Sequence, residues 1–226
     1  MKILALSTSA HRYETSGIRT GTWLGEFTHF YDVLDAAGHE VELASVAGGV
    51  VPLDPESLQS SVLQEGGTDK RYADPDFMSK LDSTPAIADV DLDSYDGICL
   101  IGGHGTMFDF QTEPVSNAVA HFADAGKIVS AVCHGPSGLL GVTLANGEPL
   151  LRNRRVTGYS WVEEELAQRT EEVPYSLEDR LREEAGEYST AKDPLAKHVV
   201  VDGKLITGQN PMSATDVGEA LLELSD

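Results

Sequence analysis

The segment AVCHGP contains the pair of residues best suited to chemistry in this chain, Cys133 followed directly by His134. Small residues flank the pair: Ala131 lies two positions before the cysteine and Gly135 two positions after it. A nucleophile at a tight strand-to-helix turn needs small neighbours, and Pro136 suits the first turn of a helix. The pattern predicts a cysteine nucleophile whose thiol pKa is lowered by the helix behind it.

The second cysteine has the opposite interpretation. Cys99 lies inside the apolar run DGICLIGG, which is typical of a central strand, and we expect it to be inert core. The chain has no CxxC motif and no Cys/His cluster with the spacing of a structural zinc site. The sequence therefore predicts no disulfide framework, no metal and no cofactor.

The sequence GGHG follows that apolar run. Glycines at a strand end let backbone N–H groups approach a substrate and stabilise an oxyanion, although the same pattern also fits a plain tight turn. We expect Gly102, Gly103 and His104 to bind the substrate or its oxyanion. A role for the Gly102–Gly103 backbone is favoured over a catalytic role for the His104 side chain.

Alternating strands and helices must position these segments. Strands are expected where the chain is apolar or alternates, at 2–7, 39–45, 96–103, 127–133 and 154–160, and at a hairpin over 198–208 with Asp-Gly at its turn. Helices are expected at 22–37, 114–125, 136–144, 162–169, 176–185 and 211–224. This order predicts an α/β fold in one domain over residues 1–226, with a doubly wound, flavodoxin-like, mostly parallel sheet and helices on both faces.

In such sheets ligands bind at the carboxyl ends of the strands. The GGHG and CHGP segments fall there, and so does the helix after the first strand, which carries Glu26. Because Glu26 lies among apolar residues, burial should raise its pKa. A protonated Glu26 could donate a hydrogen bond to a thiolate.

Charge argues against a nucleic-acid partner. The chain has 37 acidic and 16 basic residues, a formal net charge of −21, whereas nucleic-acid binding needs a basic surface. The acids are scattered, which favours a solvating surface of the halophilic kind over an ordinary acidic protein. No apolar run reaches the roughly 18 residues of a membrane helix. The start of the chain also reads as a strand rather than a signal peptide, so we expect a cytoplasmic protein with no membrane partner.

Five segments in consistent order resemble the DJ-1/PfpI superfamily over nearly the whole chain: TGTWLGEFTHFYDVLDAAGHEVELAS, SYDGICLIGGHG, AVCHGP, VTGYSWVEEE and HVVVDGKLITGQNPMSA. Within the superfamily the chain looks most like the Hsp31-like group, whose members are described as glyoxalase III and as chaperones. A histidine directly after the cysteine separates the chain from the pattern of DJ-1 proper.

The resemblance implies a role for each matching residue. Cys133 matches the nucleophile, His134 the triad histidine, and Glu26 the helix glutamate that hydrogen-bonds the sulfur. The triad acid should follow VTGYS, where three adjacent glutamates compete. Alignment favours Glu164, with Glu163 second and Glu165 third.

The activity implied is that of a glutathione-independent glyoxalase, a lyase that converts methylglyoxal to lactate (D-lactate dehydratase) through a hemithioacetal on Cys133. Its partners would be a small α-oxoaldehyde and a second copy of the chain in a homodimer. Three alternatives stay open: a holding chaperone or protein deglycase, a PfpI-like cysteine peptidase or amidohydrolase, and a redox sensor. A class I glutamine amidotransferase is disfavoured because His198, the one late histidine, precedes Val-Val instead of standing in a His-x-Glu pair.

Overall fold

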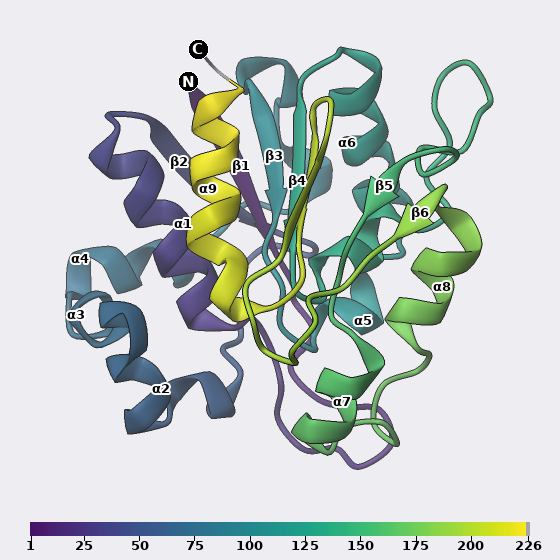
Figure 1. Cartoon of the computed structure of the whole chain (residues 1–226). Helices are drawn as coiled ribbons and strands as arrows, with labels where there is room; N and C mark the ends of the chain where they lie inside the picture. Colours follow the sequence, from purple (N-terminus) through teal and green to yellow (C-terminus); the bar gives the residue numbers. More distant parts are fainter. Residues whose placement is uncertain (225–226) are drawn as a thin grey trace.

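The computed structural model of the chain describes residues 1–224, and six strands of this part form one sheet in the order β2-β1-β3-β4-β8-β7 (Figure 1). The strands are β1 (Lys2–Ser7), β2 (Glu40–Ser45), β3 (Gly97–Leu100), β4 (Ile128–Val132), β7 (Val199–Asp202) and β8 (Leu205–Gly208). Neighbours pair in parallel except the hairpin strands β7 and β8, which are antiparallel. The predicted α/β, flavodoxin-like, mostly parallel fold with a hairpin near the C-terminus is confirmed.

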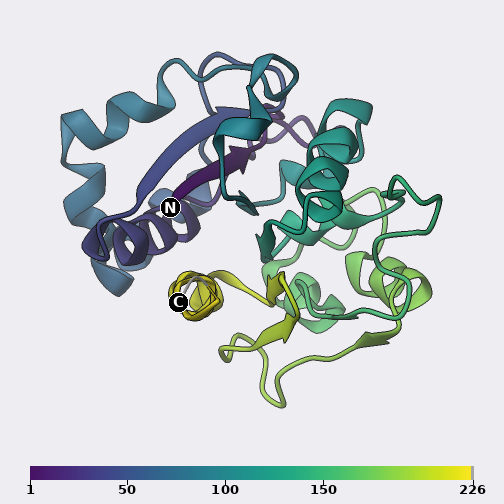
Figure 2. The same ribbon diagram turned by 90° about the horizontal axis from the view of Figure 1, so that it is seen from above.

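Helices cover both faces of this sheet. The α-helices of residues 1–224 are α1 (Leu24–Ala36), α2 (Ser60–Gln64), α3 (Thr68–Tyr72), α4 (Pro75–Met78), α5 (Thr106–Asp109), α6 (Glu113–Asp124), α7 (Trp161–Ala167), α8 (Leu177–Glu184) and α9 (Ala214–Glu223). Helices α1 and α9 pack together on one face, and α6 lies on the other (Figure 2). None of the helices in residues 1–224 is long and apolar enough to cross a membrane.

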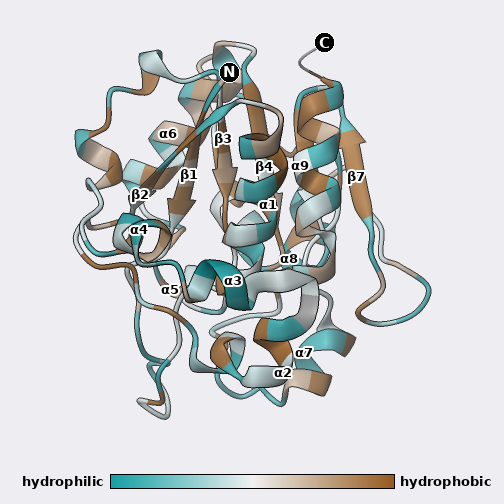
Figure 3. Cartoon of the chain, turned by 90° about the vertical axis from the view of Figure 1, so that its left-hand side faces the viewer, coloured by the Kyte–Doolittle hydropathy of each residue, from teal (hydrophilic) through white to brown (hydrophobic). Residues whose placement is uncertain are grey.

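The core lies between the sheet and these helices. Strands β3 and β4 are buried along their whole length, and Figure 3 shows the central strands as hydrophobic against a largely hydrophilic α3. Helix α1 buries an apolar face against the sheet: Phe27, Phe30 and Leu34 are all fully buried, whereas Ala37, one turn further on, is exposed. Burying a side chain of this size contributes about 1.5–3 kcal/mol, so this face fixes α1 on the sheet. Gly38, at φ +79°, follows the C-cap residue Ala37, a position where a left-handed glycine commonly ends a helix.

The expected strand over 154–160 is mostly wrong. Only Arg155–Val156 forms a strand, β5, and it pairs with β6 (Glu187–Tyr188) in a separate two-stranded sheet. Beyond it, the backbone N–H of Thr157 donates to the Thr207 hydroxyl, and the N–H of Tyr159 donates to the Cys133 carbonyl. These bonds replace a regular ladder and bring the segment to the end of β4.

The expected helix over 136–144 is also too long. A 3-10 helix spans Gly135–Leu139 and ends there, because Leu140 is extended and Gly141 has φ +70°. The hairpin turn lies one residue later than expected: Asp202 pairs with Leu205, which leaves Gly203-Lys204 as the two-residue loop.

Candidate active site

Cys133 lies in a strained turn directly after β4. Its φ of +60° is left-handed, which is uncommon for a residue other than glycine and costs of order 1–3 kcal/mol. Two backbone hydrogen bonds hold it there: its N–H donates to the Gly208 carbonyl at 2.9 Å, and its carbonyl accepts from the Tyr159 N–H at 2.9 Å. Gly135 must be small, because a Cβ atom there would lie 2.2 Å from the Leu100 carbonyl oxygen.

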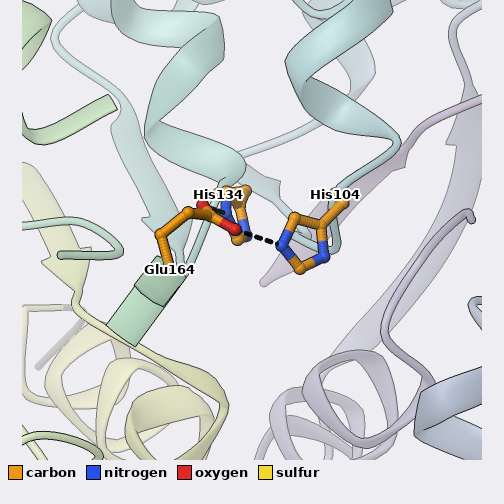
Figure 4. A group of neighbouring side chains, drawn as sticks. All are labelled: His104, His134 and Glu164. Atoms are coloured by element: carbon orange, nitrogen blue, oxygen red, sulfur yellow. Dashed lines mark hydrogen bonds and ion pairs between the residues drawn. The ribbon is translucent and has the colours of Figure 1, made fainter. Parts of the chain in front are cut away.

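A hydrogen-bonded chain runs from this cysteine into α7. Cys133 Sγ lies 3.3 Å from His134 Nδ1. On the other side of that ring, His134 Nε2 lies 2.8 Å from Glu164 Oε2, a contact drawn in Figure 4. All three side chains are buried, and the Tyr159 ring lies 4.3 Å from the His134 ring between centroids. The arrangement is thiol, imidazole and carboxylate in sequence, which is how a base-activated nucleophile is built.

The three competing glutamates lie in different places. Glu164 reaches His134, whereas Glu165 is exposed to solvent. Glu163 closes a capping box with Ser160 and also accepts hydrogen bonds from the Leu195 N–H and the Asn210 side-chain amide. Adjacent helix positions point about 100° apart, so only one of the three can face the histidine.

The His104 side chain is part of the same cluster. Its Nε2 lies 2.7 Å from Glu164 Oε1, so one carboxylate joins two histidines, and the His104 and His134 rings are 4.2 Å apart between centroids (Figure 4). The sequence favours a role for the neighbouring glycine backbone and does not predict this contact, because the partner Glu164 lies far along the chain from His104. No local spacing signals such a pair.

Glu26 lies beside the cysteine and is fully buried in the first turn of α1. Its Oε2 accepts a hydrogen bond from the Gly102 N–H at 2.9 Å, so this N–H, which was expected to face substrate, is engaged elsewhere. A Cβ atom at Gly102 would lie 2.6 Å from the same oxygen, which explains the glycine. Burial raises the pKa of Glu26 to about 8, as the sequence analysis expected, although hydrogen bonding to Cys133 and Gly102 opposes the shift.

The expected lowering of the cysteine pKa is wrong. Burial, and then the Glu26 carboxyl, raise the pKa of Cys133 well above its usual value, and the short 3-10 helix behind it does not reverse this. Burial and the charge of His104 lower the pKa of His134. Burial opposes ionisation of Glu164, but the charge of His134 and the hydrogen bonds from both histidines lower its pKa well below the usual range. The resting site therefore holds a thiol, a neutral His134 and a carboxylate.

A cavity of about 250 Å³ opens above these groups. Its walls come from seven segments of the chain: Trp23, Glu56, Gly103, His104, Cys133, His134, Tyr159, Glu163, Leu166, Ala167, Leu195, Pro211 and Met212. Among the apolar side chains in this wall, those of Leu166, Leu195 and Met212 are more than a third exposed. Most of these wall residues were not expected from the sequence. The TGQNPM segment, which was used only for the resemblance, was the available signal for Pro211 and Met212.

Within residues 1–224, one set of three side chains has metal-ligating proximity: the donor atoms of His104, His134 and Glu164 lie within 4.8 Å of one another. Both Nε2 nitrogens already bond to the Glu164 carboxylate, and they need their protons to do so. A metal would have to replace both protons, so the arrangement fits a hydrogen-bonded relay better than a metal centre.

Comparison with known proteins places this geometry in context. A sequence model described as the DJ-1/PfpI family matches residues 18–224. The glutathione-independent glyoxalase HSP31 of Saccharomyces cerevisiae is 28% identical over 219 residues, which cover 94% of this chain and 92% of that protein.

Two solved structures superpose on almost the entire chain. The crystal structure of glyoxalase III from Candida albicans has a TM-score of 0.90 at 27% identity and covers 99% of this chain and 97% of its own. The Rapid Encystment Protein 24 KDa of Francisella tularensis has a TM-score of 0.92 at 34% identity, with 99% and 98% covered.

Proposed function

The chain belongs to the DJ-1/PfpI family, with proteins of the Hsp31 and glyoxalase III group among its relatives, and we propose that it is a glutathione-independent glyoxalase. Its substrate would be a small α-oxoaldehyde such as methylglyoxal, and its product the corresponding 2-hydroxy acid. The observation that carries the proposal is the pair of contacts beside the cavity: Cys133 Sγ lies next to His134 Nδ1, and His134 Nε2 lies next to Glu164 Oε2.

The first step follows from the resting protonation states. Because the Cys133 thiol is protonated and His134 is neutral, His134 Nδ1 takes the thiol proton as sulfur attacks the aldehyde carbon. Glu164 stabilises the imidazolium that forms, and the Gly103 N–H is the donor we assign to the new oxyanion. His134 then protonates that oxygen, which gives the hemithioacetal.

The later steps move hydrogen within the adduct. The carbon-bound proton of the hemithioacetal leaves, an enediol forms, and protonation of the neighbouring carbon gives a thioester of the 2-hydroxy acid. Water then cleaves the sulfur–carbon bond, releasing the acid and restoring the thiol. Methylglyoxal plus water thus gives lactate, and the balance needs no oxidant or reductant.

The state of Glu26 supports this chemistry. With a pKa of about 8, Glu26 is mostly protonated at neutral pH, so it places no negative charge beside a developing thiolate. Its Oε1 has no N or O hydrogen-bond partner among the described residues, which leaves the proton on that oxygen to be directed at the sulfur.

The test is incubation with methylglyoxal in the absence of glutathione, at low and at molar KCl, with lactate measured as product. Wild type should consume the aldehyde and Cys133→Ala should not. Cys99→Ala is the matched control, because Cys99 is fully buried away from the cavity and its thiol pKa is raised to about 12 by burial. Failure of wild type to consume methylglyoxal at either salt concentration would overturn the proposal.

A second candidate rests on the exposed apolar side chains at the cavity mouth, Leu166, Leu195 and Met212. Such a rim suits an apolar or protein-linked ligand, as in a holding chaperone or a protein deglycase. Suppression of client-protein aggregation would survive Cys133→Ala in a holdase, whereas a cysteine peptidase would lose cleavage of a fluorogenic peptide with the same change.

A further inference from the structure

One buried histidine in the cavity wall has no part in the steps assigned so far. His104 is 4% exposed and lines the same cavity as Cys133. Its ring lies between Tyr13 and His134, with centroids 5.7 and 4.2 Å away. A side chain held so tightly, with one nitrogen bonded to Glu164, has a defined orientation.

The shared carboxylate also defines which nitrogen of each ring carries the proton. Glu164 is ionised, so its two oxygens can only accept hydrogen bonds. His134 Nε2 and His104 Nε2 must therefore both be donors. In the neutral form of either ring, the proton sits on Nε2 and the lone pair on Nδ1.

The two Nδ1 lone pairs differ in their partners. His134 Nδ1 faces the Cys133 sulfur at 3.3 Å. His104 Nδ1 is buried and has no hydrogen-bond partner among residues 1–224, and it lies on the side of the ring away from Glu164 (Figure 4). Leaving a buried acceptor unsatisfied costs about 1–3 kcal/mol. Such a cost is understandable if the lone pair is used when substrate is bound.

We propose that His104 Nδ1 is the general base that removes the carbon-bound proton of the Cys133 hemithioacetal and returns it to the neighbouring carbon. This assignment rests on the proposed glyoxalase function. It gives the two histidines separate tasks: His134 handles the proton of the sulfur, and His104 handles the proton of the carbon.

The step balances within the adduct. The C1–H bond breaks, its proton moves to His104 Nδ1, and its electron pair forms the C1=C2 bond while the C2 carbonyl pair moves to oxygen. The hydroxyl proton on C1 passes to the neighbouring C2 oxygen. His104 then gives its proton to C2, and the C1 oxygen pair re-forms a carbonyl, now that of a thioester.

The shared Glu164 makes the two transfers sequential. One carboxylate can neutralise one imidazolium, and the rings are only 4.2 Å apart, so a charge on His104 disfavours a charge on His134. His134 must return its proton to the hemithioacetal oxygen before His104 accepts one. A single buried negative charge thereby serves both halves of the reaction.

The test uses His104→Gln, whose amide nitrogen keeps a donor for Glu164 but offers no basic lone pair. We expect kcat for methylglyoxal to fall by about 10²- to 10⁴-fold. Alkylation of Cys133 by iodoacetamide should stay close to the wild-type rate, and intact mass should show the methylglyoxal adduct accumulating on the protein. With methylglyoxal deuterated at the aldehyde carbon, the isotope effect on kcat should be larger in the variant than in wild type. His121→Gln, on α6 outside the cavity, is the matched control and should behave as wild type.

Each other outcome overturns the assignment. If His104→Gln keeps its kcat, His104 is not the base. If it loses alkylation and turnover together, His104 acts on Cys133 by positioning Glu164 and His134. If wild type alkylates normally but does not turn over methylglyoxal, the proposed function itself fails, and the base assignment with it.

Discussion

Glu163 and Glu164 are adjacent and both buried, yet their carboxylates have different partners. Glu164 accepts hydrogen bonds from His104 and His134, at the chemical centre of the cavity. Glu163 accepts from the Leu195 N–H and the Asn210 amide, so it ties the cavity wall to the start of α7. One residue step along the helix thus separates a group that would act in the chemistry from one that holds the structure.

Glu164→Gln should lower kcat for methylglyoxal by about 10³- to 10⁴-fold, which is the scale of the loss when the histidine of a triad has the wrong tautomer. A glutamine has one acceptor oxygen where two histidine N–H groups need acceptors, so one ring must turn or change tautomer. Steady-state kinetics are the measurement, and the exposed Glu165→Gln should match wild type. A loss below tenfold would contradict the relay.

Glu163→Gln should lower the free energy of unfolding by about 1–3 kcal/mol. Both Glu163 oxygens accept hydrogen bonds, so in the glutamine variant one buried N–H donor would face an amide N–H₂ group instead of an acceptor. Urea unfolding measures this, with Glu165→Gln again as the control. If Glu163→Gln unfolds like wild type but loses activity as Glu164→Gln should, the two roles are exchanged.

The raised pKa of Glu26 gives a pH dependence with a definite sign. Its folded value is about 8 against an ordinary 4.5, so between these values the folded state holds a proton that the unfolded state has lost. Stability should therefore decrease as pH rises through this window, by at most about 1.4 kcal/mol per pH unit. Glu26→Gln removes this titration. As pH rises from about 5 to about 8, the unfolding free energy of wild type should therefore decrease relative to that of the variant. Parallel curves would show that Glu26 titrates normally.

Much of the fold could be predicted because its pattern is local. The apolar run that ends in Cys133 and the helical spacing of Phe27, Phe30 and Leu34 each need only a few consecutive residues. Most of the strand expected over 154–160 did not form, because the backbone N–H groups of Thr157 and Tyr159 bond to Thr207 and Cys133, which are distant in sequence.

The candidate site shows the same division. The choice among the glutamates could have been sharpened, since Ser160 and Glu163 have the spacing of a capping box, which occupies Glu163 and leaves Glu164 free to contact His134. The link between His104 and Glu164 had no such local signal, because tertiary folding alone creates it. The thiol pKa also depended on burial that no local pattern shows.

The acidic surface predicts a response to salt. With a net charge of −21, the folded chain repels itself, and salt shortens the range of that repulsion from about 10 Å at 0.1 M to about 3 Å at 1 M. The melting temperature should rise when KCl is increased from about 0.1 M to about 2 M. Glucose at equal osmolality is the control for solvent exclusion. A melting temperature that is flat or falls with KCl would rule out charge repulsion as a main cost of folding.

The hydrogen bond from the Cys133 N–H to the Gly208 carbonyl has a consequence for biosynthesis. A ribosome releases Glu26, His104, Cys133 and Glu164 well before it releases β8, and until β8 docks beside β4 the left-handed turn at Cys133 lacks one of its two clamps. Before that point, Cys133 is held by at most one of these two backbone hydrogen bonds. The thiol acquires its working geometry only when β8 is inserted into the sheet, so a chain that terminates before β8 does not carry the assembled site.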